Sequence, residues 1–322
     1  MAHALHAPVS RQRGLALITA VLVVAIVATV ATYLALGQQI WLRQTQNLAD
    51  RAQAESLRQA ALDWIALLLT RDAEQNKVDH LGELWAKQLP PLPAEGGVIA
   101  ATISDAQGRF NLNNLLRGGN PSQPDIGVFQ HLLTALGLDP TLTDAVIDWM
   151  DANSDRLPGG AEDVDYLALP HPYRAANQPL TTVDELRLVR GFTPDIVEKL
   201  RPYVTVLPEA TSININTAVD QVLAAMFTNL PASALQPLLQ SRVSQPFTDN
   251  SQLVQRLPPG QAAPQAAYAV NTSYFLVTLD VRVGGLQRRS EALIYRPYGK
   301  PATVLWHRQN VLQLETKADE KT

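Results

Sequence analysis

A run of oxygen-bearing side chains between residues 151 and 162 has the spacing of a calcium-binding loop. Asp151, Asn153 and Asp155 occupy positions 1, 3 and 5 of the segment DANSDRLPGGAE, and Glu162 occupies position 12. Ca²⁺ prefers six to eight hard oxygen ligands, and alternate side chains followed by a bidentate glutamate can wrap such an ion. The carbonyl group of Leu157 would supply position 7. The sequence therefore predicts a Ca²⁺ site with the ligand spacing of an EF-hand.

Two features separate this loop from an ordinary EF-hand. Arg156 stands at position 6, where the EF-hand turn requires glycine, so the spacing predicts the ligand set but not that turn. Asp163 and Asp165 follow at once, which places five carboxylates between residues 151 and 165 with one arginine among them. Such crowding of negative charge is unfavourable unless a cation neutralises it. The alternative interpretation is a solvated acidic loop that holds no metal.

The loop lies within residues 113–262, a stretch typical of short helices separated by glycine and proline. Two parts of it, residues 132–149 and 186–200, have the order helix, glycine turn, helix of DNA-binding helix-hairpin-helix modules. Both turns lack the second glycine that completes a phosphate cradle. The stretch holds 9 Lys and Arg against 16 Asp and Glu, a net charge of −7 that repels DNA. We therefore expect helices that pack for structural reasons, and no nucleic-acid partner.

Segments with strand-like alternation of apolar and polar residues flank this helical stretch. The predicted strands are residues 98–104, 274–283, 289–295 and 303–308. A hairpin is expected to begin at the turn of residues 105–108, and Gly284-Gly285 is expected to link the second and third strands. The predicted fold class is α+β, with a large all-α domain inserted into a small antiparallel sheet.

The N-terminal part contains 22 consecutive residues without a charge, residues 15–36. A helix of that length spans a hydrocarbon layer of about 30 Å. Arg11 and Arg13 precede the run, which favours an internal N-terminus by the positive-inside rule. A signal peptide is the alternative, but the run is longer than the usual apolar region of one, and no small-residue cleavage site follows it. We expect a single transmembrane helix.

The helical pattern continues beyond the apolar run. Apolar positions recur at helical spacing as far as Trp64, Ile65 and Leu68, with polar residues between them. One long helix, first apolar and then amphipathic, is predicted. The segment Arg11-Gln12-Arg13-Gly14 before it resembles the processing site of type IV prepilins, with cleavage between Gly14 and Leu15. The helix then resembles a pilin stem that packs under a sheet, and a plain N-terminal anchor is the alternative.

Longer motifs resemble the helical insertion of the general secretion pathway protein K family. The matching segments are Ala145-Val-Ile-Asp-Trp-Met-Asp, Pro158-Gly-Gly-Ala-Glu-Asp, Pro172-Tyr-Arg-Ala-Ala-Asn, residues 186–191, Arg201-Pro-Tyr-Val-Thr-Val-Leu-Pro and Ile213-Asn-Ile-Asn-Thr-Ala. The resemblance implies a pseudopilin fold, with its long stem helix packed on the small sheet, whose inserted α-domain carries Ca²⁺. On that basis Asn177 is a further candidate oxygen ligand.

The resemblance implies a minor pseudopilin of the type II secretion system, located in the inner membrane with most of the chain in the periplasm. The implied partners are other minor pseudopilins, the inner-membrane secretion platform, the prepilin peptidase and secreted substrates. Most pilins have glutamate at the fifth residue after the cut, where this chain has Thr19. That difference and the bulky insert lead us to expect a position at the pseudopilus tip, where the chain initiates assembly. The alternative is a pseudopilin-like component of a type IV pilus or DNA-uptake system.

Catalytic motifs do not accompany these features. The chain lacks Gly-x-Ser-x-Gly, His-Glu-x-x-His and a glycine-rich phosphate loop, its six histidines are scattered, and it has no cysteine. We therefore expect an assembly protein and not an enzyme. The predicted division is a leader at 1–14, a transmembrane helix at 15–36, the stem and first strands at 37–112, the inserted domain with the calcium site at 113–262, and the last strands and tail at 263–322.

Overall fold

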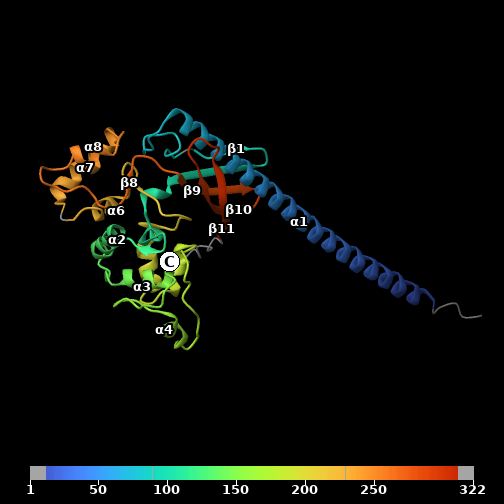
Figure 1. The fold of residues 1–322 in the computed structure, drawn as a ribbon. Helices are drawn as coiled ribbons and strands as arrows, with labels where there is room; N and C mark the ends of the chain where they lie inside the picture. Colours follow the sequence, from blue (N-terminus) through green and yellow to red (C-terminus); the bar gives the residue numbers. More distant parts are fainter. Residues whose placement is uncertain (1–11, 89, 229, 311–322) are drawn as a thin grey trace, which may run out of the picture.

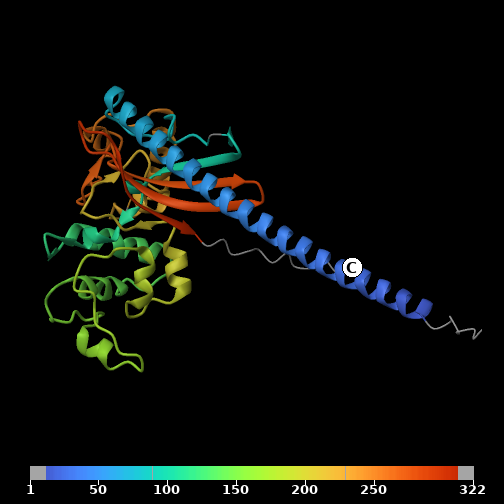
Figure 2. The same cartoon turned by 90° about the vertical axis from the view of Figure 1, so that its right-hand side faces the viewer.

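A single long helix projects from a globular body (Figure 1). The computed structural model describes residues 12–88, 90–228 and 230–310, so most of the predicted leader and tail lies outside the described residues. Helix α1 runs without interruption over Gln12–Gln75 and contains a segment apolar enough to cross a membrane. Residues 15–49 are exposed throughout, and Figure 2 shows this half of α1 extending away from the body. The predicted single stem helix is confirmed.

The second half of α1 packs on a five-stranded sheet. Leu62, Ile65 and Leu69 are buried at helical spacing and contact a cluster that includes Phe275 and Val277. Each buried leucine or isoleucine stabilises the contact by roughly 1.5–3 kcal/mol relative to an exposed side chain. The sheet is thus held to the stem by an apolar stripe on one side of α1.

The sheet has the strand order β1-β2-β9-β10-β11, and all its pairs are antiparallel. Its strands are β1 (Leu92–Ala94), β2 (Gly97–Asp105), β9 (Tyr274–Val283), β10 (Leu286–Tyr295) and β11 (Thr303–Asn310). Val283 pairs with Leu286, so Gly284 and Gly285 form the predicted two-residue turn, and Gly284 has a φ of 54° that favours glycine. The predicted antiparallel strands are confirmed.

The hairpin expected at residues 105–108 is wrong. These residues form a short 3-10 helix, η1 (Ala106–Gly108), after which β3 (Phe110–Asn111) pairs in parallel with β6 (Val204–Thr205). Strand β2 instead pairs with β1 and with β9. The reason is that Phe110 and Leu112 are fully buried in a second core, which draws the chain away from the sheet.

That second core belongs to a helical head, which we define as residues 110–270, the span of its apolar cluster. It lies between β2 and β9 in the chain, as the predicted insertion requires, and its core extends a few residues beyond both predicted bounds. Its helices are α2 (Gln123–Ala135), α3 (Leu142–Met150), α4 (Asp163–Leu167), η3 (Val183–Leu188), α5 (Pro194–Leu200), α6 (Asp220–Ala225), α7 (Ala232–Ser244) and α8 (Ser251–Gln255), with η2 (Leu112–Leu115).

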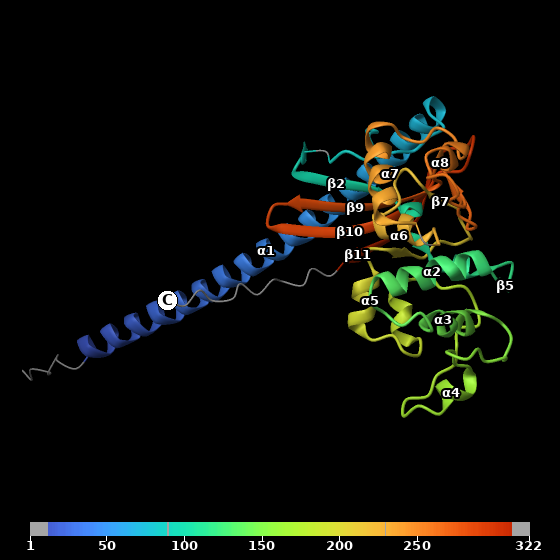
Figure 3. The ribbon, with the colours of Figure 1, turned by 90° about the vertical axis from the view of Figure 1, so that its left-hand side faces the viewer.

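Among the described residues of the head, the regular structure is mainly helical, and the strand pairs are very short. These are β3 with β6, β4 (Leu116–Arg117) with β5 (Asn120–Pro121), and β7 (Ile213–Asn214) with β8 (Tyr268–Ala269). Figure 3 shows α2 and α6 side by side in the head, with α5 next to β11 of the sheet. The α+β class with a helical domain is confirmed.

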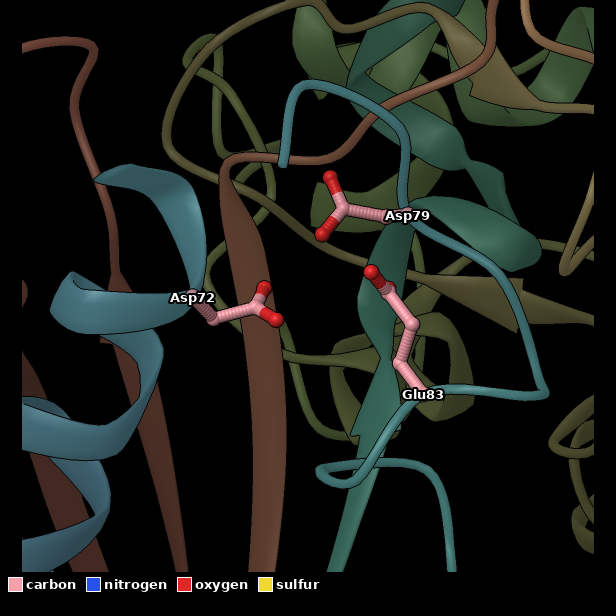
Figure 4. Close-up of side chains that lie close together, drawn as sticks. All are labelled: Asp72, Asp79 and Glu83. Carbon is pink, nitrogen blue, oxygen red and sulfur yellow. The ribbon is translucent and has the colours of Figure 1, made fainter. Parts of the chain in front are cut away.

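Buried charges join the stem, the sheet and the loop after α1. Asp72 of α1, Asp79 and Glu83 bring their carboxylate oxygens within 4.8 Å of one another (Figure 4). The guanidinium of Arg296, directly after β10, donates to Asp72 at 2.8 Å and to Asp79 at 2.5 and 2.6 Å. Arg296 also lies 4.6 Å from the ring centre of Phe275. Arg296 therefore pairs with two of the three carboxylates, whereas Glu83 accepts hydrogen bonds from the N–H of His80 and from Trp85 Nε1.

A second buried carboxylate lies where the head joins the sheet. Asp105 accepts hydrogen bonds from the backbone N–H of Gln107, from Asn214 Nδ2 at 2.8 Å and from Thr217 Oγ1 at 2.6 Å. Asn214 Nδ2 also donates to the carbonyl of Asp79. Burial raises the pKa of Asp105 to about 6, against the lowering effect of these donors.

Replacement of Arg296 by methionine should destabilise the protein strongly. The variant Arg296→Met leaves Asp79, which is 2% exposed, without its counter-charge. Removing one partner of a buried pair costs about 3–5 kcal/mol. Urea unfolding of the full chain in detergent measures this change. The control Arg289→Met breaks an exposed pair with Asp280 and should cost less than about 1 kcal/mol. Equal effects of the two variants would contradict the assignment.

The raised pKa of Asp105 gives stability a defined pH dependence. The folded state holds this proton more tightly than the unfolded chain, so the free energy of unfolding should decrease as the pH rises from about 4 to about 6. In Asp105→Asn this contribution is lost, which should flatten the slope by up to about 1.4 kcal/mol per pH unit. Unfolding curves at several pH values between 4 and 7 provide the test. Identical slopes for the two proteins would show that Asp105 does not titrate in this range.

Candidate functional site

The acidic loop predicted to bind calcium connects α3 to α4. In Figure 1 α4 lies at the end of the head farthest from β1. The loop contains no regular structure between Asp151 and Glu162. The candidate site is therefore held by the ends of two helices and by side chains that anchor the loop between them.

Two carboxylates of α3 that the sequence analysis did not include anchor this loop. Asp148, which is fully buried, accepts hydrogen bonds from the backbone N–H of Leu157 at 3.0 and 3.3 Å. Asp144, one helical turn earlier, accepts from the N–H of Gly159 at 3.0 Å. A Cβ atom on Gly160 would lie 1.9 Å from Asp148 Oδ2, so this close approach requires glycine. The spacing of residues 144, 148 and 151 on one helix face was a signal that could have identified them.

Two of the predicted ligands, Asp151 and Glu162, lie buried at the two ends of the loop. They are 5% and 6% exposed. Asp151 Oδ1 and Glu162 Oε1 are buried and have no hydrogen-bond partner among the described residues. Burial, and then the negative charges of Asp148 and Asp151, raise the pKa of Glu162 to about 7. Burial likewise raises the pKa of Asp148 to about 6. Burial and mutual repulsion of neighbouring carboxylates therefore disfavour the charged forms of Asp148 and Glu162.

The ligands predicted within the loop are more open to solvent. Asn153 and Asp155 are exposed, and Asn153 Oδ1 accepts a hydrogen bond from the N–H of Asp155 at 2.6 Å. The carbonyl of Leu157 accepts from the N–H of Gly160 at 3.0 Å. Asn177 donates its N–H to the carbonyl of Trp149 and, together with Asp151, lines a cleft of about 460 Å³. The structure thus brings Asn177 next to Asp151.

Asp163 and Asp165 make ion pairs within the protein. Asp163 contacts Arg174 at 3.2 Å and accepts from the N–H of Ala175 at 2.9 Å. Asp165 contacts Arg156 at 3.2 Å and Arg190 at 3.4 Å. The N–H of Glu162, and then these arginines, hold the pKa of Asp165 below its usual value. Both carboxylates would have to exchange arginine for metal before they could act as ligands.

The loop does not form an EF-hand turn. Among the described residues Asn177 is the one non-glycine with a positive φ, so Arg156 lacks the left-handed conformation that position 6 of an EF-hand takes. In the part of the chain that the structure describes, three carboxylates approach within 4.8 Å only at Asp72, Asp79 and Glu83, where Arg296 is bound. The predicted ligands are neighbours, but their oxygens do not converge in this way.

A long N-terminal helix that is apolar at its free end and packs on a small antiparallel sheet at the other end defines the class of pilin-like proteins. The helical head inserted between β2 and β9 distinguishes this chain within that class. The family description "Type II secretion system (T2SS), protein K" matches residues 108–209 and 213–271. These residues coincide closely with the head.

Known relatives agree with this match. A type II secretion system protein K from Pseudomonas aeruginosa is 36% identical over 286 residues, covering 85% of each chain. One from Pectobacterium carotovorum is 34% identical and covers 89% of this chain and 93% of the relative. The crystal structure of the GspK-GspI-GspJ complex from enterotoxigenic Escherichia coli matches with a TM-score of 0.68 and 25% identity, over 83% of this chain and 99% of that one.

The chain belongs to the protein K family of the type II secretion system. It is a minor pseudopilin of that system, and the alternative of a type IV pilus or DNA-uptake component is not favoured. The relatives are named as components of a secretion system and not as enzymes.

Proposed function

We propose that this protein forms the tip of a periplasmic pseudopilus together with other minor pseudopilins, and that it initiates assembly of the filament. The observation that carries this proposal is the similarity over most of the chain to a protein K that was crystallised with two further proteins of its secretion system, GspI and GspJ. The exposed apolar half of α1 supports it, because such a surface requires either lipid or neighbouring stems. The role is one of assembly and not of catalysis.

The tip position is supported by Thr19 and by the size of the head. Thr19 is exposed and donates its hydroxyl hydrogen bond to the backbone carbonyls of Leu15 and Ala16, within its own helix. It has no carboxylate to pair with the N-terminal amine of a subunit above it. A head of about 160 residues would also obstruct an identical subunit stacked on top of it. A subunit with nothing above it needs neither the ion pair nor the space.

The proposed location is the inner membrane, with α1 as the single span and the body in the periplasm. Before assembly the prepilin peptidase would cut between Gly14 and Leu15, and the inner-membrane platform would then receive the stem. Secreted proteins are a further class of proposed partner.

Processing at this bond predicts that the mature chain begins at Leu15. N-terminal sequencing of the protein extracted from membranes tests this directly. A chain that begins at Met1, or beyond Leu36 as after signal-peptide cleavage, would disprove the proposed processing.

The acidic loop is proposed to bind Ca²⁺, because the orphaned oxygens of Asp151 and Glu162 fit a hard cation. Asn153, Asp155, the Leu157 carbonyl and Asn177 are near enough in the chain or in the cleft to complete the ligand set, and Asp163 and Asp165 would join after release of their arginines. Bound Ca²⁺ would neutralise the carboxylates and hold α3 and α4 together.

Calcium should therefore stabilise the folded protein. A ligand that binds only the folded state at a hundredfold excess over its Kd adds about 2.7 kcal/mol, so a chelator should lower the Tm of the full chain in detergent. The variant Glu162→Gln keeps the shape of the side chain but should lose most of the response to Ca²⁺. Glu198→Gln, an exposed residue of α5, serves as the control and should respond like the wild type. An unchanged Tm in chelator, with no metal in the purified protein, would rule out the site.

The assembly role predicts a single position in the filament. The full chain should co-purify with other minor pseudopilins after detergent extraction, and gold labels on its head should mark one end of each pseudopilus. Labels repeated along the shaft would exclude the tip position. If cells that carry Thr19→Glu secrete normally, Thr19 is not essential for the tip position. The position of the gold label still decides whether the protein lies at the tip.

A further inference from the structure

A cleft of about 590 Å³ lies between the helical head and the face of the sheet that α1 does not cover. Its floor is formed by residues of β2, β9, β10 and β11 that point away from the stem, and its other wall by residues of η3, α5 and β6. Figure 3 shows α5 beside β11, where the two walls meet. A volume of this size is within the range of ordinary ligand-binding sites.

Three arginines line the cleft, and two of them have carboxylate partners within the protein. Arg201 contacts Glu198 at 2.8 Å and Asp184 at 2.6 Å. Arg308 contacts Glu291 at 2.9 Å. The third, Arg109, makes no ion pair or side-chain hydrogen bond among residues 12–88, 90–228 and 230–310, although it is partly buried.

Arg109 is partly buried, and none of its nitrogen atoms is among the fully buried atoms that lack a hydrogen-bond partner in the described residues, so its guanidinium remains open to the cleft. Burial lowers the pKa of Arg109, and the more distant Glu291 offsets this only in part. Arginine remains charged at neutral pH, and its planar fork matches a carboxylate with two parallel hydrogen bonds. Because Arg109 lines the cleft and makes no ion pair with the described residues, its guanidinium is available to bind a carboxylate from outside them.

The rest of the lining suits an extended peptide. Hydroxyl groups of Thr102, Ser104 and Thr278 cover the floor and can bond to a peptide backbone. Trp306, with Arg308 5.0 Å from its ring centre, offers an aromatic surface at one side. The cleft also faces away from α1, so stems packed against the helix would leave it open.

We propose that this cleft binds an extended acidic segment of a protein exported by the secretion system, with Arg109 holding its carboxylate. The charge of Arg109 argues for an acidic segment, and the position of the cleft opposite the stem argues for a passing protein and against a neighbouring subunit. This inference rests on the proposed function in secretion.

Peptide binding to the purified full chain tests the chemistry. The probe is a capped heptapeptide with a central glutamate. The control peptide, called its match below, is identical except for glutamine at that position. The glutamate peptide should bind at least about tenfold more tightly than its match, and Arg109→Gln should remove this preference. Arg289→Gln, on the same sheet face but outside the cleft, should retain it. Arg109→Lys keeps the charge without the fork and should give an intermediate preference. Equal binding of both peptides to the wild type would overturn the proposal.

Photo-crosslinking in secreting cells tests the source of the segment. A crosslinking residue in place of Thr278 should join the chain to an exported protein, and Arg109→Gln should reduce that product at least about tenfold. Adducts only with another pseudopilin, or only within the chain itself, would overturn the inference. Co-purification with minor pseudopilins is measured in the same cells, so loss of assembly, which contradicts the proposed function, is distinguished from loss of the crosslink alone.

Discussion

The ion pairs of Arg296 hold the end of α1, the loop after it and the end of β10 in a fixed arrangement. Asp72 lies near the end of α1, Asp79 in the loop after it, and Arg296 directly after β10. Asp79 also accepts the N–H of Thr272, where the chain returns from the head to the sheet. A buried ion pair adds little net stability, because removing both charges from water is costly. Any arrangement that separates the two charges is strongly unfavourable, so the pair favours one geometry. This contact and the apolar stripe of α1 together fix the orientation of the stem relative to the sheet.

Buried asparagines fix the position of the head relative to the sheet by hydrogen bonds. Asn214 bonds to Asp79 and Asp105, while Asn111 and Asn113 bond to backbone groups of the segment around Leu207. The asparagine side chain both donates and accepts hydrogen bonds, so it can satisfy backbone N–H and C=O groups that are not paired in a sheet. The junction is therefore polar and well bonded although it contains only strand pairs of two residues.

The two faces of the sheet divide the molecule into surfaces of different character. One face is covered by the apolar stripe of α1, whose free half can only be satisfied by lipid or by other stems. The other face lies under the head and combines a small apolar cluster around Tyr274 and Leu293 with the polar cleft, and the acidic loop is at the far end of that head (Figure 1). The apolar stem, the cleft under the head and the acidic loop are thus separated in space.

The periodicity of the sequence by itself determined the main helices and strands. Only the tertiary structure decided which charged side chains pair with one another. An uncharged run of 22 residues, followed by apolar residues at helical spacing, predicts one long stem helix. Alternation of apolar and polar residues predicted strand 274–283 with the bounds that the structure shows. Spacing also predicted Asp151 and Glu162 as ligands, and the structure shows that both side chains are buried. Spacing could not show that Asp148 anchors their loop or that arginines hold Asp163 and Asp165. Nor could it show that β2 pairs with β9 instead of with a strand directly after residue 108. These pairings depend on which residues, far apart in the sequence, become buried next to one another. A charged group needs a partner once it is buried, and the sequence does not show which groups are buried together.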